Sequence, residues 1–316
     1  MTDKEKYNNL SSIDIHSLSP EELKIAIHEW AEGDEAMEAL LWKCYYTGVE
    51  TKQSHAGGRP FIEVSADQNA DKVKNMIDSV SDIDGFSILI SPDGGNPFSG
   101  DVFYKAGIGI IFLSTEYQED AEILFNKMNA SLDLEKKSNS KMADSIINLY
   151  NFFREKESDL EFRIRFVDGK YIFNAEINGR MHTEEFEKMF SGFGLVQDKE
   201  AVFNSWCFES DNLEEFGNRL EAVSNAIISS YSFEKPDKLD ERMSLNEVFR
   251  YLRRRYVERD GDDTIYKEVA SQFYEEFNQH QKDLYEGKIT RDEGEEWIKG
   301  RFFEMEADVM GSQRLN

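Results

Sequence analysis

The segment from Ser54 to Pro60 has the residue types of a small binding or catalytic loop. It reads Ser-His-Ala-Gly-Gly-Arg-Pro, and the two adjacent glycines allow a ligand to approach the backbone closely. In such a loop His55 can serve as a base, Arg59 can bind an anion and Ser54 can supply a hydroxyl group. A Gly-Gly-Arg-Pro turn is also typical of a hairpin that joins two strands. The sequence therefore offers His55, Ser54 and Arg59 as catalytic candidates, with a purely structural turn as the alternative.

The second candidate is a dense group of basic residues, Arg250, Arg253, Arg254, Arg255 and Arg259. They fall beside an apolar helical stripe, on faces where guanidinium groups can contact the phosphates of an RNA. The alternative is a face that neighbouring carboxylates neutralise, among them Glu247 and Glu258. The first interpretation predicts a nucleic-acid-binding helix from Arg250 to Arg259, and the second predicts only a solvated bundle surface.

Metal and cofactor sites are not indicated. The two cysteines, Cys44 and Cys207, are far apart in apolar segments, which favours buried thiols in a reducing compartment over a disulfide or a zinc site. The histidines have no ligand spacing, and the acids near Asp260 lack the pattern of a calcium loop. No glycine-rich segment matches a nucleotide-binding motif. We therefore expect no metal and no cofactor.

The charge of the chain limits its partners. Its 63 Asp and Glu residues against 37 Lys and Arg give a formal net charge of −26. Such a field repels bare nucleic acid unless a local basic patch overrides it, whereas it suits a basic protein that itself holds RNA or DNA. The alternative is that the acidity only keeps the protein in solution. No apolar run approaches a membrane span, so we expect a cytoplasmic protein with no membrane partner.

The first half of the chain predicts an α+β domain. Residues 1–18 are a polar N-terminal segment, and residues 19–132 form the domain. Ser19-Pro20-Glu21-Glu22 predicts a capped helix start, and a second helix ends at Gly48. The remaining pattern predicts strands at Val49–Lys52, Phe61–Val64, Phe86–Ile90 and Val102–Leu113, with helices at Val73–Val80 and Ala121–Met128.

A polar linker from Asp133 to Lys141 leads to a second predicted α+β domain, residues 142–235. Its strict alternation at Leu160–Phe166 predicts a strand with both arginines on the wet face. Asp168-Gly169 and Asn178-Gly179 are type I′ turn signals. The other predicted elements are helices at Met142–Phe153, Glu184–Phe190 and Leu213–Ile228 and strands at Tyr171–Ile177 and Ala201–Phe208.

The C-terminal region, residues 236–316, shows three helical stripes and predicts a small bundle or arm. The fold class expected from the whole pattern is α+β: two small, mainly antiparallel-sheet α+β units followed by a C-terminal helical bundle.

Four short segments near the N-terminus resemble a known module. They are Ile27-His28-Glu29-Trp30-Ala31-Glu32-Gly33, Leu40-Leu41, Gly48-Val49-Glu50-Thr51 and Arg59-Pro60-Phe61-Ile62. Together they are similar to the N-terminal module of Gram-positive mobile-element proteins, including some type II anti-CRISPR proteins. The match covers about a fifth of the chain. The Cys and His of the family's loop are replaced here by the segment Ser54–Gly58.

The resemblance implies a mobile-element-encoded, anti-CRISPR-like inhibitor. Combined with the acidity, it predicts a protein that binds a basic nucleic-acid-handling effector in the host cytoplasm, such as Cas9 or its guide-RNA complex. The alternative is an RNA-processing or RNA-modifying enzyme that uses the Ser54–Arg59 loop and grips RNA through the Arg250–Arg259 helix. A regulatory or scaffolding protein is a third possibility. We lean against an enzyme because the sequence holds no convincing catalytic constellation.

Overall fold

The computed structural model describes residues 18–94, 105–135, 137–155, 160–177, 183–198, 204–230, 239, 245–261 and 264–311. The chain divides into two compact units. One comprises Met1–Ile177 and Glu184–Tyr231, and the other comprises Asn178–Thr183 and Ser232–Asn316. The predicted α+β class is confirmed, because the first unit combines an antiparallel sheet with helices and the elements described in the second unit are helices. The predicted polar segment 1–18 lies outside the described residues except for Leu18.

Two helices open the first unit where the sequence predicts them. Helix α2, Pro20–Trp30, begins with a complete capping box between Ser19 and Glu22. Helix α3, Glu35–Thr47, has Asp34 as its N-cap and ends at Gly48, whose φ of 72° is the left-handed conformation that glycine adopts without steric cost. These local signals set where both helices begin and where α3 ends, while packing of their buried faces stabilises them.

The sheet has eight strands in the order β1-β2-β4-β3-β5-β6-β8-β7, and every neighbouring pair is antiparallel. The strands are β1 Glu50–His55, β2 Phe61–Ser65, β3 Phe86–Gly94, β4 Lys105–Thr115, β5 Leu160–Val167, β6 Lys170–Ile177, β7 Val196–Asp198 and β8 Asn204–Ser210. The sequence missed β7, which is three residues long. Residues 102–104 and 201–203, at the starts of two predicted strands, lie outside the described residues.

The two predicted α+β units share this one sheet. Strand β3 from the first pairs with β5 from the second, with Phe86 opposite Phe166 and Ile90 opposite Phe162. Helix α6, Lys141–Glu155, packs on β3 and β4 and against helix α8, Leu213–Ser230. The expectation of two separate sheets is therefore wrong, because burying the apolar face of β5 under α6 extends the existing sheet.

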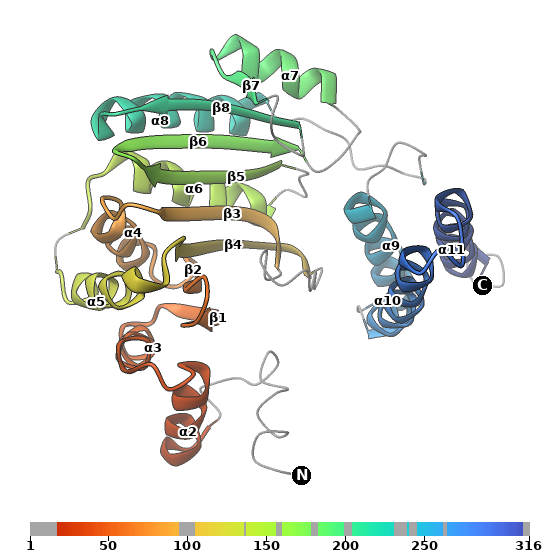
Figure 1. The fold of residues 1–316 in the computed structure, drawn as a ribbon, viewed down its shortest axis with the longest axis horizontal. Coiled ribbons are helices and arrows are strands. Elements are labelled where there is room, and N and C mark those ends of the chain that lie inside the picture. The colour runs from red at the N-terminus through yellow and green to blue at the C-terminus, as the bar shows by residue number, and fades with distance from the viewer. Residues whose placement is uncertain are drawn as a thin grey trace. The chain divides into compact units, whose positions relative to one another are not determined.

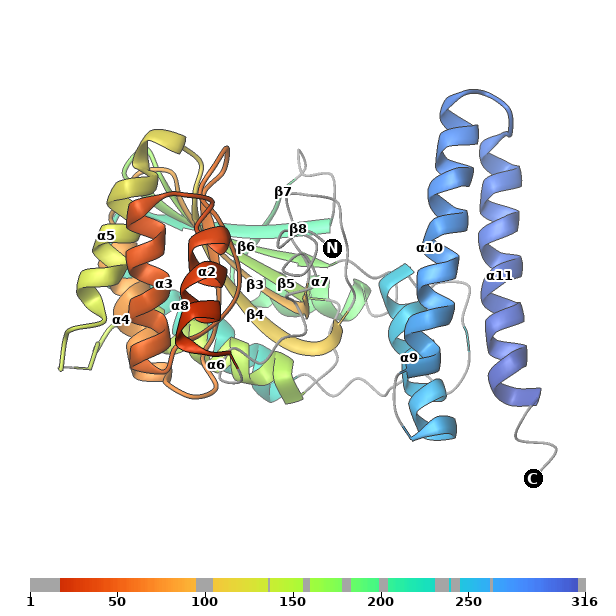
Figure 2. The same cartoon turned by 90° about the horizontal axis from the view of Figure 1, so that it is seen from below.

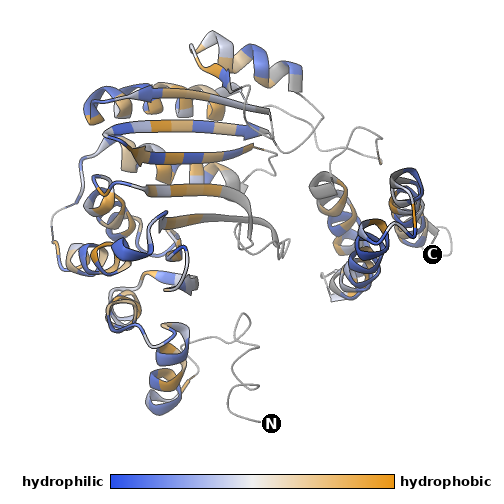
Figure 3. Ribbon diagram, in the orientation of Figure 1, coloured by the Kyte–Doolittle hydropathy of each residue, from blue (hydrophilic) through white to orange (hydrophobic). Residues whose placement is uncertain are grey.

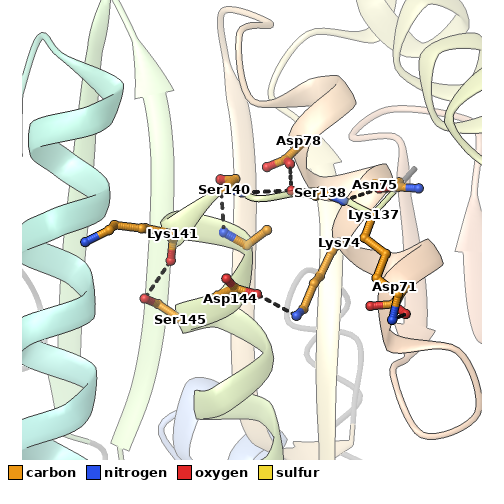
Figure 4. Close-up of polar contacts among 11 residues, drawn as sticks. Asp71, Lys74, Asn75, Asp78, Lys137, Ser138, Ser140, Lys141, Asp144 and Ser145 are labelled. Carbon is orange, nitrogen blue, oxygen red and sulfur yellow. Dashed lines mark hydrogen bonds and ion pairs between the residues drawn. The ribbon is translucent and has the colours of Figure 1, made fainter. Parts of the chain in front are cut away.

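The segment predicted as a linker joins the two halves tightly (Figure 4). The backbone N–H of Ser138 donates to Asn75 Oδ1 on helix α4, Ala70–Val80, at 2.9 Å, and the Ser138 hydroxyl donates to the carboxylate of Asp78. Lys74 forms an ion pair with Asp144 of α6 at 2.5 Å. Burial is the largest cause that raises the pKa of Asp78 above its usual range. These contacts hold α4, the loop and α6 together.

Both faces of the sheet carry buried residues: Ile88 and Ile164 share one face, and Leu89 and Phe112 share the other. Apolar residues run along the central strands (Figure 3). Figure 1 shows α6 and α8 behind the strands, and the side chains that point toward them are buried, among them Ile88, Ile164 and Phe173. Along β5, buried residues alternate with half-buried ones, as the sequence predicts. The remaining helices of this unit are α5, Ala121–Ser131, and α7, Thr183–Gly192, with a short 3-10 turn, η3, at Gln118–Asp120.

The turn between β5 and β6 follows its predicted type. Asp168 has φ 52° and Gly169 has φ 75°, as a type I′ turn requires. The second turn signal, at 178–179, lies outside the described residues.

The second unit contains a three-helix bundle, α9 Leu245–Asp260, α10 Thr264–Tyr285 and α11 Arg291–Gly311, and each helix contacts the other two (Figure 2). Its core is aromatic: the Phe249 ring lies 5.2 Å from Phe273 and 5.6 Å from Phe302. Within the described residues, no helix combines the length and the apolar character needed to cross a membrane.

Candidate functional site

The Ser54–Arg59 loop forms the end of a hairpin between β1 and β2. The register pairs His55 with Phe61 and Ser54 with Ile62, so Ser54 and His55 point to opposite faces. The Ser54 hydroxyl donates to the backbone carbonyl of Trp30 at 3.1 Å, at the C-terminal end of α2. The structure therefore does not bring the Ser54 hydroxyl to His55 as a nucleophile next to its base.

His55 is paired with a carboxylate. Its Nδ1 lies 3.0 Å from Oε1 of Glu32, whose other carboxylate oxygen accepts from the backbone N–H of Ala56 at 3.2 Å. Glu32 follows α2 and has φ 54°, so this contact ties the hairpin to the end of the helix. A Cβ at Gly57 would lie 3.6 Å from Nε2 of His55, which places that nitrogen beside the Gly-Gly turn. This arrangement orients the imidazole, as a carboxylate does for a general base.

Arg59 is on the far side of the same loop. Its guanidinium lies 3.8 Å from the carboxylate of Glu116, and Gln118 Nε2 donates to the Ala56 carbonyl at 3.0 Å. The loop is thus bound on one side by the residues after α2 and on the other by the residues after β4. Its three candidate residues thus contact the segments that flank the hairpin.

The arginines of α9 are engaged with the bundle. Arg259 contacts Asp260 at 2.7 Å and Asp308 at 3.3 Å and lies 4.7 Å from the Tyr256 ring centre. Arg255 pairs with Glu258 at 3.2 Å. The hydrogen bond to Asp260 raises the pKa of Arg259, and burial raises that of Tyr256 to about 12.

The other three candidate arginines give less support to an RNA-binding face. Arg254 lies 5.8 Å from the Tyr251 ring centre, and Arg253 also has a contact within the chain. The side chain of Arg250 lies outside the described residues. Of the described guanidinium groups, those of Arg255 and Arg259 are therefore paired with carboxylates before any phosphate approaches.

Carboxylates gather at one end of the sheet, which the sequence did not reveal. We call Asp84, Glu116, Asp120 and Asp168 the acidic rim. The register places Phe86 opposite both Thr115 and Phe166, so the residues just beyond these strand ends meet at one end of the sheet. The Asp84 carboxylate accepts from the backbone N–H of Asp168 at 2.8 Å, which joins two of the loops.

Tyr117 lies among the carboxylates of the acidic rim. Its side chain is 39% exposed, so the ring presents apolar surface to solvent. The rim carboxylates, Asp84 first, raise the pKa of its phenol because they disfavour a second negative charge nearby. The ring packs over Gly85, where a Cβ would come within 2.5 Å of it. An exposed aromatic ring among carboxylates is suited to receive a cationic side chain.

The described residues contain no group of three or more His, Cys, Asp or Glu side chains that could hold a metal. Cys44 is buried, which raises the pKa of its thiol to about 12, and Cys207 is half-buried; neither forms a disulfide. His28 contacts Glu38 at 2.8 Å, and His280 stacks on Trp297 at 3.9 Å. His182 lies outside the described residues.

Comparisons of the chain with protein-family models, with curated proteins and with solved structures find no significant match. The site must therefore be interpreted from its own geometry.

Proposed function

We propose that the protein is a binding protein that inhibits a basic nucleic-acid-handling effector, such as a Cas9-type protein or its guide-RNA complex. The acidic rim around Tyr117 is the observation that carries the proposal. The formal net charge of −26 supports it, since charge complementarity accelerates the encounter with a basic partner. The resemblance of the N-terminal segments to anti-CRISPR proteins supports the choice of effector.

The rim combines two features of protein-binding surfaces. The carboxylates attract a basic segment toward this end of the sheet. The exposed Tyr117 ring offers an aromatic anchor, a kind of residue that supplies much of the binding energy in many interfaces. A Lys or Arg side chain over the ring would contact the π face while pairing with a carboxylate such as Asp84 or Asp168. The partner chemistry that fits is a flexible or protruding segment rich in Lys and Arg.

Complex formation between the purified protein and a guide-RNA-loaded effector tests the proposal. Binding should weaken as salt rises, and the protein alone should not shift duplex DNA in a gel. Tyr117→Ala should weaken binding by about tenfold, the scale of one interface anchor, while Tyr117→Phe should leave it nearly unchanged. Binding that ignores both salt and Tyr117→Ala would refute this assignment of the surface.

The His55–Glu32 contact favours the RNA-processing enzyme as a second candidate. If the imidazole is a general base, His55→Gln should reduce the rate of RNA turnover by at least about a hundredfold while leaving effector binding intact. Under the binding proposal, the wild type should not turn over RNA, and the same variant should inhibit the effector as well as the wild type does. A melting curve shows whether the hairpin survives the substitution.

A further inference from the structure

Strand β5 carries two arginines on the face of the sheet opposite α6 and α8. Arg163 and Arg165 alternate with the buried residues Phe162 and Ile164, and both arginines are half-buried. In Figure 1, α6 and α8 lie behind the strands, so the arginines start from the face turned toward the viewer, where their neighbours Leu89, Ser87 and Asn174 are buried. The two guanidinium groups therefore start from the same strand on the same side, with Cα atoms about 7 Å apart.

Neither guanidinium is neutralised in the part of the chain that the structure describes. No ion pair there involves Arg163 or Arg165, and the Nε atom of each is buried without a hydrogen-bond acceptor. The one hydrogen bond from the pair runs from Arg165 Nη2 to Asn174 Oδ1 at 3.4 Å. A buried charged donor without an acceptor costs more than a neutral one, so an anionic ligand would gain this free energy on binding.

The directly opposite neighbours of the pair on β3 and β6 are uncharged, two of them apolar and two polar, and Glu161 precedes Arg163 by two residues on the same face of β5. The register places Arg163 between Leu89 and Asn174, and Arg165 between Ser87 and Ile172. Asn174 is 5% exposed, and its amide nitrogen also donates to Ser205 at 3.4 Å. Asn174 is thereby held in place and acts as a positioning residue for Arg165. The two arginines are therefore half-buried among packed neighbours and are not freely exposed surface side chains.

We propose that Arg163 and Arg165 bind the phosphate group of a small phosphorylated ligand on the face of the sheet opposite α6 and α8. A phosphate monoester dianion matches the charge of two guanidinium groups, and its oxygens can accept paired hydrogen bonds from both. A carboxylate or a phosphodiester carries one negative charge and neutralises half of the pair. A long nucleic-acid strand also meets the repulsion of the chain's net charge. This inference does not rest on the proposed function.

Calorimetry with inorganic phosphate and with adenosine monophosphate tests the proposal, at ionic strength matched with sodium chloride. Both probes should bind saturably to the wild type. Arg163→Gln and Arg165→Gln should each weaken binding at least tenfold. Lys170→Gln is the matched control, because it removes one positive charge from the same sheet at a residue already paired with Glu209 at 2.8 Å. The control should bind like the wild type.

Three results would overturn the proposal. They are absence of saturable binding to the wild type, equal weakening in all three variants, and binding of citrate or of a single-stranded oligonucleotide at least as tight as that of adenosine monophosphate. If the glutamine variants do not fold, Arg163→Lys and Arg165→Lys retain the charge and lose the planar fork. Both should then bind phosphate more weakly than the wild type, and unchanged affinity would contradict recognition by guanidinium groups.

Discussion

Neutralising the acidic rim without changing its shape should weaken effector binding in a salt-dependent way. The triple variant Glu116→Gln, Asp120→Asn and Asp168→Asn replaces three carboxylates by amides of similar size. Asp84 stays, because its carboxylate accepts the backbone N–H of Asp168. Asp120 makes no side-chain cap hydrogen bond to α5, and asparagine tolerates the φ of 52° at residue 168. The fold should therefore survive.

The size of the effect follows from Coulomb's law. A rim carboxylate about 8 Å from a partner cation contributes about 0.5 kcal/mol in a water-like dielectric. Three such charges amount to about 1.5 kcal/mol, or about a tenfold loss of affinity at low ionic strength. Near physiological ionic strength the Debye length is also about 8 Å, which reduces the loss to about 0.6 kcal/mol, or about threefold.

The assay compares this triple variant with Glu29→Gln, Glu184→Gln and Glu187→Gln, which remove the same charge from exposed positions on α2 and α7. Affinity is measured at several salt concentrations. Without any partner, the phenol of Tyr117 reports the rim field, because its pKa should fall toward its ordinary value in the rim variant and not in the control.

Equal losses in the two triple variants would mean that net charge alone acts and that the rim has no special role. No loss in the rim variant, with the Tyr117 pKa lowered as expected, would refute electrostatic recognition at this end of the sheet. Only a larger and more salt-sensitive loss in the rim variant agrees with the proposal.

Three stability predictions follow. Gly85→Ala should destabilise the first unit by at least about 1–2 kcal/mol in denaturant unfolding, because φ is 75° and the new Cβ would clash with Tyr117. Arg259→Gln should destabilise the bundle by about 1–3 kcal/mol, since the arginine is mostly buried and Asp308 loses its cation; an unchanged melting temperature would contradict this. Asp78 has a raised pKa, so its contribution to stability is greatest in acid and is lost as pH rises through its folded-state pKa. Asp78→Asn should therefore raise the melting temperature at neutral pH and give no such gain below about pH 4.

Local sequence signals predicted most elements because their causes are local. The capping box at Ser19, the glycine stop at Gly48 and the alternation in β5 act within a few residues. The pairing of β3 with β5 has no such signal, since it joins residues about 75 positions apart. The prediction of two separate sheets was wrong for this reason.

The candidate sites divide in the same way. The Ser54–Arg59 loop was visible as a motif, yet its partner Glu32 is 23 residues from His55, and no sequence pattern connects the two. The acidic rim comes from three separate loops spread between Asp84 and Asp168. In the sequence, only the net charge indicated an acidic surface, without its position. The meeting of these acids depends on strand register, which the sequence did not determine.

Strand β5 also shows why register alone does not explain its arginines. A shift of one residue would turn Arg163 and Arg165 into the apolar core under α6, so both residues help to fix the pairing. Any polar side chain would serve that purpose, and serine, asparagine and glutamine would do so without two charges that lack a counter-ion. Two guanidinium groups side by side in a half-buried position are costly for the fold. Their presence is explained by an anion that they bind, and the glutamine variants separate these roles because they keep the register and remove the charge.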